Sequence, residues 1–381
     1  MIKMNGSDLN ERFGIDQYDK RIMMEFQKDS SITHNALAKM ISKSQPAVGA
    51  RILKMEQKSL LFKQYTMDLS KVNMVFGIVT LYARNAHEFV NNLVNCPFII
   101  NTFISTGKSN VIVWLVALSL EKIEEIVDFN FRSNENVSNV NLYISVDSIN
   151  TATLPVDLNI EKEEDDYCSE DCCSIIHPRL ANMHLDEGVD GGMFNEIYDI
   201  DEFDKQIIRF LNVDPDMTHT EIGKRIGKSQ PTVGARVGKL REKGLLVLKN
   251  SVNFKEVEHL QLVQLSIVAT NVTKLIEKLE ACNLVMVGFK VTGDKSIIGY
   301  TATTSLKLLD RTIEGCLRQD PNVTEIETTL VLESTKDLVL DYNIQLEYGE
   351  GQCIGCRYTS KPSKALIKEV LHEKPVIAQI K

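Results

Sequence analysis

Hydrophobic and polar positions over residues 16–61 follow the helical period in three consecutive segments. The pattern predicts a helix over 16–28, a second over 33–40, and a third that follows a turn at 41–43 and begins after Ser44, a favourable capping residue. The apolar positions of the third helix lie on its inner face: Val48, Ile52 and Met55. Residues 60–66 follow as a candidate wing strand.

Runs of β-branched residues that end at Gly or Asn then predict strands, interrupted by segments with helical spacing. The predicted strands are 75–83, 98–106, 110–118 and 140–146, and the predicted helices are 85–95 and 120–131. The order β-α-β-β-α-β is that of the split βαβ, ferredoxin-like topology.

The chain repeats this whole organisation. Residues 201–246 align without gaps on residues 16–61, at an offset of 185, and 21 of 46 positions are identical. The most similar stretch, KSQP-x-VGAR, occurs in both copies, and residues 245–248 are a second candidate wing strand. The predicted second βαββαβ segment has strands 262–270, 284–292, 296–303 and 323–332 and helices 272–282 and 305–318.

The fold class is therefore α+β, with two copies of a winged helix-turn-helix, each followed by a ferredoxin-like βαββαβ domain. The predicted divisions are 1–66 and 199–250 for the helical domains, 67–150 and 251–336 for the βαββαβ domains, 151–198 for an acidic, cysteine-containing tail and linker, and 337–381 for a C-terminal tail with Cys-x-x-Cys.

Charge is unevenly distributed along the 381 residues. The formal net charge is −9, which by itself argues against nucleic-acid binding, and residues 161–171 are strongly acidic. Residues 39–63 and 224–249 are basic, however, and they contain the predicted third helix of each helical domain. A locally basic face on an acidic protein can still bind phosphate, while acidic segments elsewhere weaken unspecific binding.

Two helices joined by a tight turn form the arrangement in which the second helix enters the major groove of DNA. Polar residues at the start of that helix suit base contacts, since Gln pairs with adenine and Arg with guanine or phosphate. The candidate DNA-binding residues are Ser44, Gln45, Ala47, Gly49, Arg51, Lys54, Ser229, Gln230, Thr232, Gly234, Arg236 and Lys239. The alternative is a helical packing domain whose basic face is merely solvated.

Residues 16–61 and 201–246 resemble the winged helix-turn-helix of the Lrp/AsnC, or feast/famine, regulators. The resemblance rests on the D-x-x-D-x-x-I opening at Asp16 and on S-x-x-x-V-x-x-R-I-x-x-M-E over Ser44–Glu56. The segment that follows is similar to the ligand-binding (RAM) domain of that family. The resemblance implies a transcription regulator that binds double-stranded DNA and whose RAM-like domains pair into homo-oligomers. We expect a cytoplasmic, nucleoid-associated protein that is not an enzyme.

Members of the family usually carry one copy per chain, whereas this chain carries two. A covalent pseudo-dimer with two DNA-recognition helices about 34 Å apart would suit a near-palindromic site. Two chains that exchange halves are the alternative, and the sequence does not decide between them.

The family carries a Thr-Gly-x-x-Asp-like turn between the second and third strands, near its amino-acid effector. The corresponding candidate effector residues here are Thr106, Gly107, Asn110, Thr292, Gly293 and Ser296. Asn110 and Ser296 replace the closing Asp, which removes a carboxylate suited to an ammonium group. Both Gly residues also fit an ordinary hairpin turn.

Eight cysteines fall into two groups. Cys96, Cys282 and Cys316 lie among apolar residues and are interpreted as small buried hydrophobic residues. The other five cluster in the two tails, where close pairs favour a metal or redox centre: Cys168, Cys172, Cys173, Cys353 and Cys356. Together they could ligate Zn²⁺ or an iron–sulfur cluster, since each needs four ligands; a reversible disulfide and free thiols are the alternatives.

Other functions are weighed against DNA binding. The sirohaem decarboxylases resemble the same two-module architecture, but their chemistry rests on His and Arg near the second and third strands, and residues 98–118 and 284–304 contain neither. A further alternative is a scaffold protein that does not bind DNA. The cations retained in both third helices argue against it: Arg51, Lys54, Arg236 and Lys239. The longest apolar run, residues 111–118, is shorter than the ~18 residues of a membrane span, and no secretory leader is recognised at the start.

Overall fold

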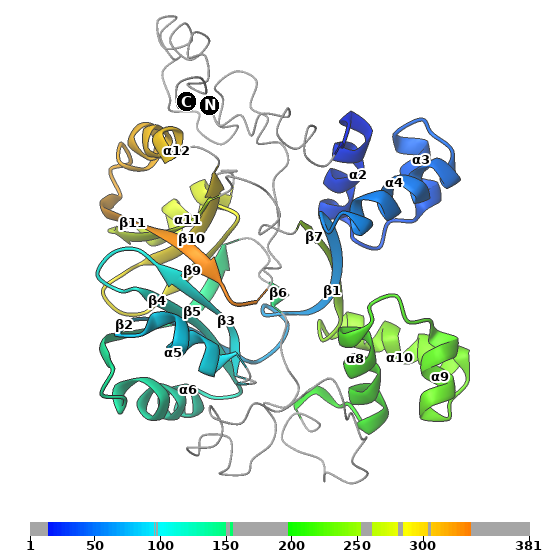
Figure 1. Ribbon diagram of the computed structural model, residues 1–381, viewed down its shortest axis with the longest axis horizontal. Coiled ribbons are helices and arrows are strands. Elements are labelled where there is room, and N and C mark those ends of the chain that lie inside the picture. Colours follow the sequence, from blue (N-terminus) through cyan, green and yellow to red (C-terminus); the bar gives the residue numbers. More distant parts are fainter. Residues whose placement is uncertain are drawn as a thin grey trace, which may run out of the picture.

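The computed structural model describes residues 14–94, 96, 98–149, 153–154, 197–252, 261–280, 285–303 and 306–336. The three-helix domains lie on one side of the molecule and a barrel of strands with its covering helices on the other (Figure 1). The cysteine tails predicted as a metal centre, the 151–198 linker apart from its described ends, and Cys282 lie outside the described residues.

Both helical domains form as the hydrophobic period predicts. Their helices are α2 (Gln17–Lys28), α3 (His34–Met40), α4 (Gln45–Gln57), α8 (Glu202–Val213), α9 (His219–Ile226) and α10 (Gln230–Glu242). Below, α2–α4 are called the first HTH domain and α8–α10 the second. Ile22, Leu37 and Val48 are fully buried between the three helices of the first domain.

Each helix starts where a side chain satisfies its free N–H groups. Asp16 and Asp201 form capping boxes with the third residue of the helix that follows. The predicted caps Thr33 and Ser44 are also confirmed, since each accepts a hydrogen bond from the backbone N–H three residues later. Such caps contribute about 1 kcal/mol each.

The two βαββαβ domains also follow the prediction. The first consists of β2 (Val75–Ala83), α5 (Ala86–Leu93), β3 (Ile99–Ser105), β4 (Val111–Ala117), α6 (Leu120–Val127) with the π-helix η1 (Asp128–Arg132), and β5 (Val137–Ile149). The second consists of β8 (Gln261–Ala269), α11 (Val272–Glu280), β9 (Val287–Val291), β10 (Ile297–Thr303), α12 (Leu306–Thr312) with η4 (Ile313–Leu317), and β11 (Val323–Ser334). The last strand of the first domain is longer than the predicted 140–146.

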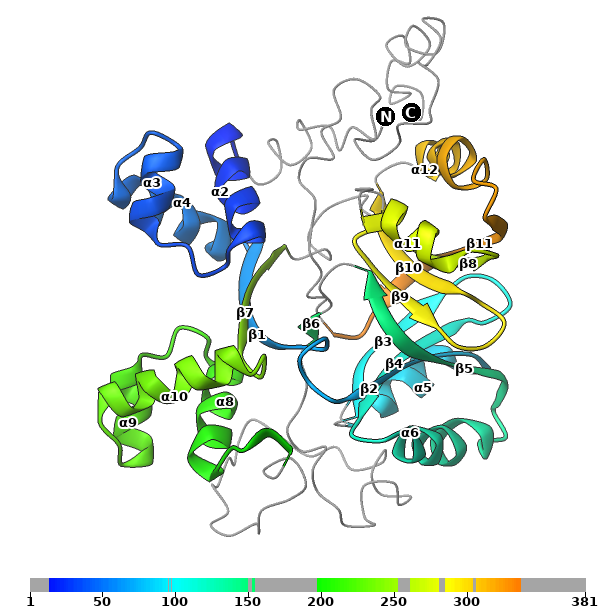
Figure 2. The same cartoon turned by 180° about the vertical axis from the view of Figure 1, so that it is seen from behind.

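The sheets of the two βαββαβ domains join edge to edge into one closed barrel. The strand order is β10-β8-β11-β3-β4-β2-β5-β9, so β11 pairs with β3 and β5 pairs with β9 across the two halves of the chain. The view from behind follows β5 as it leaves its own sheet toward β9 (Figure 2). Closing the barrel leaves neither sheet with an unpaired edge at these junctions.

Aromatic side chains from both halves fill the space between the sheets. Trp114 on β4 lies edge-on to Tyr300 on β10, with 4.9 Å between ring centroids, and its Nε1 donates a 2.8 Å hydrogen bond to the Tyr300 hydroxyl. Tyr300 in turn donates to Gln264 Oε1 at 2.8 Å. Since Trp114 is 1% exposed and Tyr300 is fully buried, this contact holds the two halves together from the inside.

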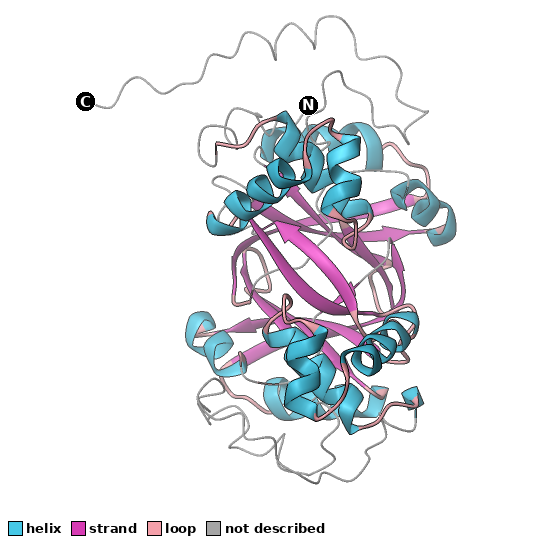
Figure 3. Ribbon diagram, turned by 90° about the vertical axis from the view of Figure 1, so that its right-hand side faces the viewer, coloured by secondary structure: helices cyan, strands magenta, loops and turns pink. Residues whose placement is uncertain are grey.

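The two candidate wing strands pair with each other instead of folding back on their own domains. β1 (Leu61–Asp68) and β7 (Val247–Val252) are antiparallel, with Leu61 opposite Val252 and Thr66 opposite Val247. The two-residue strand β6 (Thr153–Leu154) pairs with the far end of β1. In the side view the strands form the middle of the molecule and helices lie above and below them (Figure 3).

No helix among the described residues is both long enough and apolar enough to cross a membrane.

Candidate nucleic-acid interface

The first turn of the third helix is exposed in both HTH domains. Gln45 and Gln230 are exposed, together with the cap residues Ser44 and Ser229 that precede them. Each cap hydroxyl accepts a 3.4 Å hydrogen bond from a backbone N–H inside the helix. The remaining predicted residues divide into exposed ones, Lys54, Thr232 and Lys239, and partly buried ones, Ala47, Gly49, Arg51, Gly234 and Arg236.

Arg51 connects α4 to the start of α2. Its guanidinium lies 2.8 Å from an Asp16 carboxylate oxygen and 2.7 Å from Asp19 Oδ1, and Asp19 is only 3% exposed. These contacts raise the pKa of Arg51, first through the hydrogen bond to Asp19. The residue predicted to contact DNA is thus occupied by two carboxylates of its own domain.

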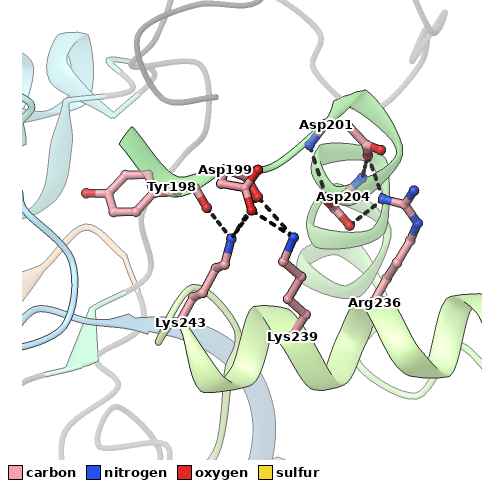
Figure 4. A network of polar contacts seen from close by, with 7 residues as sticks. All are labelled: Tyr198, Asp199, Asp201, Asp204, Arg236, Lys239 and Lys243. Carbon is pink, nitrogen blue, oxygen red and sulfur yellow. Dashed lines mark hydrogen bonds and ion pairs between the residues drawn. The ribbon is translucent and has the colours of Figure 1, made fainter. Parts of the chain in front are cut away.

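Arg236 repeats this arrangement in the second domain. It lies 2.7 Å from Asp201 and 2.9 Å from Asp204, and the three side chains converge where α8 begins (Figure 4). Burial opposes ionisation of Asp201, but the Asp204 N–H and the Arg236 side chain hold the pKa of Asp201 below its ordinary value of 3.8. Both domains therefore connect the start of their first helix to their third helix with the same ion pairs. The arginines of these pairs are residues that the sequence predicts to contact DNA.

The cations nearer the C-terminal end of the third helix are also engaged. Lys54 donates to the Gly14 carbonyl at 2.9 Å, while Lys239 lies 2.9 Å from Asp199 Oδ2. Lys243 contacts the same carboxylate and the Tyr198 carbonyl (Figure 4).

Two lysines next to the exposed first turns were not among the predicted site residues. Lys43 lies 4.1 Å from the ring centroid of Tyr18, and Lys228 lies 4.0 Å from that of Phe203. Each is exposed and directly precedes the cap serine of the third helix. A ring under the ammonium group limits its motion and leaves the charge accessible. The signal in the sequence was the Lys-Ser pair that occurs in both copies.

Gly49 and Gly234 have a packing reason for their small size. A Cβ atom at Gly234 would lie 3.3 Å from Nδ1 of His219, and one at Gly49 would lie 3.6 Å from Nδ1 of His34. The histidine of the second helix thus packs over the glycine of the third, which accounts for a glycine at both predicted positions by packing within the domain.

Side chains also tie each wing strand to the opposite HTH domain. Lys63 on β1 lies 2.8 Å from Asp216, in the loop between α8 and α9. In the other direction, Asn250 on β7 donates two hydrogen bonds to Ser30: its backbone N–H to Ser30 Oγ at 3.2 Å and its Nδ2 to the Ser30 carbonyl at 3.0 Å. Together with the β1–β7 ladder, these contacts set the distance between the two exposed first turns.

Two of the predicted effector residues make hydrogen bonds that join the two halves. The Thr106 N–H donates to the Leu330 carbonyl at 2.9 Å, and the Thr292 N–H donates to the Ile144 carbonyl at 3.0 Å. Within the first half, the Asn110 side chain accepts a hydrogen bond from the Ala83 N–H and donates one to the Ala83 carbonyl, both at 2.8 Å.

The second turn has the same local structure as the first. Ser296 Oγ accepts from the Ala269 N–H at 3.0 Å, at the position that Asn110 occupies in the first domain. Gly107 and Gly293 have φ of 99° and 101°, as the hairpin interpretation predicts. Tyr143 from the other half packs beside Gly293, where burial and then the charge of Asp294 raise its pKa to about 12.

Cys96 and Cys316 are buried at 2% and 6% exposure, as predicted. Among the described residues there is no group of three or more His, Cys, Asp or Glu side chains that could hold a metal ion.

Comparison with known proteins identifies the helical domains. The model of the AsnC-type helix-turn-helix domain matches residues 15–56 and 200–241. The HTH-type transcriptional regulator Ptr1 of Methanocaldococcus jannaschii is 28% identical over 141 residues, which is 36% of this chain and 95% of that protein. LrpC of Bacillus subtilis, also an HTH-type transcriptional regulator, is 26% identical over 36% of this chain and 96% of its own length.

Each of these relatives thus corresponds to a little over one third of this chain. The chain thus contains two AsnC-type helix-turn-helix domains in tandem, and it is similar to transcriptional regulators of the Lrp/AsnC type. Over nearly the whole length, the fold is similar to the crystal structure of the siroheme decarboxylase NirDL, with a TM-score of 0.53, 14% identity, and coverage of 94% of this chain and 100% of that one.

Proposed function

We propose that the protein is a sequence-specific DNA-binding transcription regulator in which α4 and α10 enter successive major grooves of one duplex. The observation that carries this proposal is the pair of AsnC-type domains whose exposed first turns, at Gln45 and Gln230, belong to one continuous structure through β1 and β7. Two recognition helices in a fixed relation match a site with two half-sites.

The side chains divide into three roles. Gln45 and Gln230 contact base edges, for which the bidentate amide is suited to adenine. Lys43 and Lys228 bind phosphate and set the register on the duplex. Arg51 and Arg236 position the recognition helices through their carboxylate contacts, in place of the direct DNA contact expected from the sequence.

The chain acts as a covalent pseudo-dimer in this proposal, with half-sites about 34 Å apart. The β1–β7 ladder, the barrel junctions and the Trp114–Tyr300 hydrogen bond all join the two halves of one chain, as a covalent pseudo-dimer requires. Further copies associate through the barrel domains, and a small-molecule effector near Thr106 and Thr292 would act on contacts between the halves. The protein would work on nucleoid DNA in the cytoplasm.

Selection of binding sites from random duplexes, followed by mobility-shift titration, tests the proposal. Gln45→Ala with Gln230→Ala should weaken binding to the selected site about tenfold or more and leave unspecific binding unchanged, because base contacts alone are lost. Lys43→Ala with Lys228→Ala should weaken all duplexes and lower the salt dependence by the equivalent of about two phosphate contacts. Gln57→Ala, an exposed change at the far end of α4, is the matched control. Absence of any selected sequence would refute the proposal.

The fold similarity to a siroheme decarboxylase favours a second candidate, a tetrapyrrole-decarboxylating enzyme. At 14% identity that similarity extends to the fold alone. Strands β3, β4, β9 and β10 contain no His or Arg to bind a propionate or supply a proton, and aromatic side chains fill the space between the sheets. A titration with a tetrapyrrole, followed by its absorption spectrum, separates the two candidates.

We also propose that the cysteine tails hold zinc or an iron–sulfur cluster as a sensor or structural clip. The support is their spacing in the sequence, because these residues lie outside the described ones. Anaerobic elemental analysis with a visible spectrum distinguishes colourless zinc from iron–sulfur. Cys353→Ser should lose the metal and Cys96→Ala should keep it, whereas metal-free wild-type protein would refute the prediction.

A further inference from the structure

The two recognition helices present nearly the same outer surface but differ at one position in their first turns. Ser44, Gln45 and Pro46 match Ser229, Gln230 and Pro231, and the cap hydrogen bonds are the same length. The next residue is Ala47 in α4 and Thr232 in α10. The recognition surfaces of the two domains are therefore not copies of each other at the end that enters a groove.

The difference at this position is chemical as well as steric. Thr232 is exposed, and its Oγ1 lies 2.8 Å from Ser229 Oγ, with either atom able to donate. It thus offers a hydroxyl as well as a methyl group beside Gln230. Ala47 offers a methyl group alone, which suits contact with the methyl of thymine, while a threonine hydroxyl hydrogen-bonds to a base edge.

The other exposed differences between the two helices lie beyond the first turn or involve side chains that contact a wing strand. Leu53, 54% exposed, corresponds to Gly238, but both lie about two turns beyond the helix start, outside the N-terminal part that contacts bases. Glu56 corresponds to Arg241, and each is turned to the wing strand: Glu56 toward Lys63 at 3.1 Å and Arg241 toward the Tyr65 hydroxyl at 3.4 Å.

The barrel interior distinguishes the two halves of the chain. Trp114 and Tyr300 occupy equivalent positions of the two copies, yet one donates and the other accepts their shared hydrogen bond. Gln264, which accepts from Tyr300, has Ile78 as its counterpart. The two halves are complementary and not interchangeable, so the chain has a defined first and second domain.

We propose that the chain recognises an asymmetric duplex site, whose two half-sites differ at the base pair that faces Ala47 in one and Thr232 in the other. This inference rests on the proposed DNA-binding function. A homodimer of identical subunits presents the same residue to both half-sites, whereas a covalent tandem is free of that constraint. The half-site under the second domain carries a hydrogen-bonding requirement that the half-site under the first lacks.

The test is site selection from random duplexes with the full-length protein and three variants. Wild type should select two half-sites at one spacing that differ at a single position. Ala47→Thr should select a palindrome of the second half-site, and Thr232→Ala a palindrome of the first. Ala47→Thr combined with Thr232→Ala should select the same duplex as wild type, bound in the opposite orientation. Each single variant should prefer its own palindrome to the wild-type site about fivefold, the lower end of the effect of one base contact.

The outcomes separate this inference from the function on which it rests. A wild-type site that is a perfect palindrome, or single variants that select the same site as wild type, would overturn the asymmetry and leave DNA binding standing. Failure to enrich any sequence would overturn both. Since Thr is already accommodated at the equivalent position of α10, circular dichroism of Ala47→Thr should match wild type.

Discussion

The exposed HTH surfaces and the buried barrel interior have diverged differently since the chain was duplicated. Across the third helices, Ser-Gln-Pro, Gly-Ala-Arg and one lysine are the same in both copies. In the barrel, Trp114 corresponds to Tyr300 and Ile78 to Gln264. Core packing ordinarily resists change, but a core shared by two linked halves can change on one side and compensate on the other. The two copies thus share the surface to which we assign DNA binding and differ in the interior where the two halves meet.

The largest effect should come from the barrel interior. Trp114→Ala removes an indole that packs against Phe76, Phe103 and Tyr300 and leaves the Tyr300 hydroxyl without its donor. We expect a loss of about 3–5 kcal/mol in the free energy of unfolding, measured by urea denaturation. Phe129→Ala, at a 42% exposed aromatic of η1, is the control. Equal losses for the two variants would mean that the halves do not depend on this contact.

Next is the ion-pair arrangement of the first HTH domain. Arg51→Ala leaves Asp19 buried without its partner, which should cost about 2 kcal/mol in unfolding free energy. Adding Asp19→Asn should restore part of the lost unfolding free energy, because the buried charge is removed. DNA affinity should fall only to the extent that the angle of the recognition helix changes. If the single variant keeps full stability and loses DNA binding, Arg51 contacts DNA directly, as the sequence alone predicted.

A smaller effect should appear on acidification. Burial opposes the charge on Asp16, but hydrogen bonds from the Asp19 N–H and Arg51 hold its pKa below 3.8, and the same holds for Asp201. The ionised form is therefore favoured by folding, so this stabilisation is complete above the ordinary pKa and is lost as the pH falls through the lowered pKa. Asp16→Asn should lower the free energy of unfolding by about 1 kcal/mol at pH 7, a small effect because the side chain is half exposed. The loss should be smaller at pH 3, where Asp16 is partly protonated in the wild-type protein. A pH-independent difference would contradict this account.

The smallest effect concerns two turns where the copies differ. Ser42 and Ser59 have φ of 55°, and their counterparts Gly227 and Gly244 have φ of 67° and 74°. Ser42→Gly removes the strain of a side chain in the left-handed region and should stabilise by up to about 1 kcal/mol, seen as a higher Tm. Gly244→Ala is the opposite control, because its Cβ would lie 2.7 Å from the Lys71 side chain. A lower Tm for Ser42→Gly would count against this explanation.

Periodicity, caps and the internal repeat were sufficient to predict the helices, the strand order of each βαββαβ domain and the exposed recognition turns. Local patterns determine these features, because apolar spacing sets the buried face and an Asp, Ser or Thr cap sets where a helix begins. Tertiary structure alone decided that Arg51 and Arg236 meet carboxylates, that β1 pairs with β7, and that Trp114 reaches Tyr300. These partners lie 32 to 191 residues apart in the sequence, and a side chain's charge or size does not specify which distant group it will contact until the chain has folded.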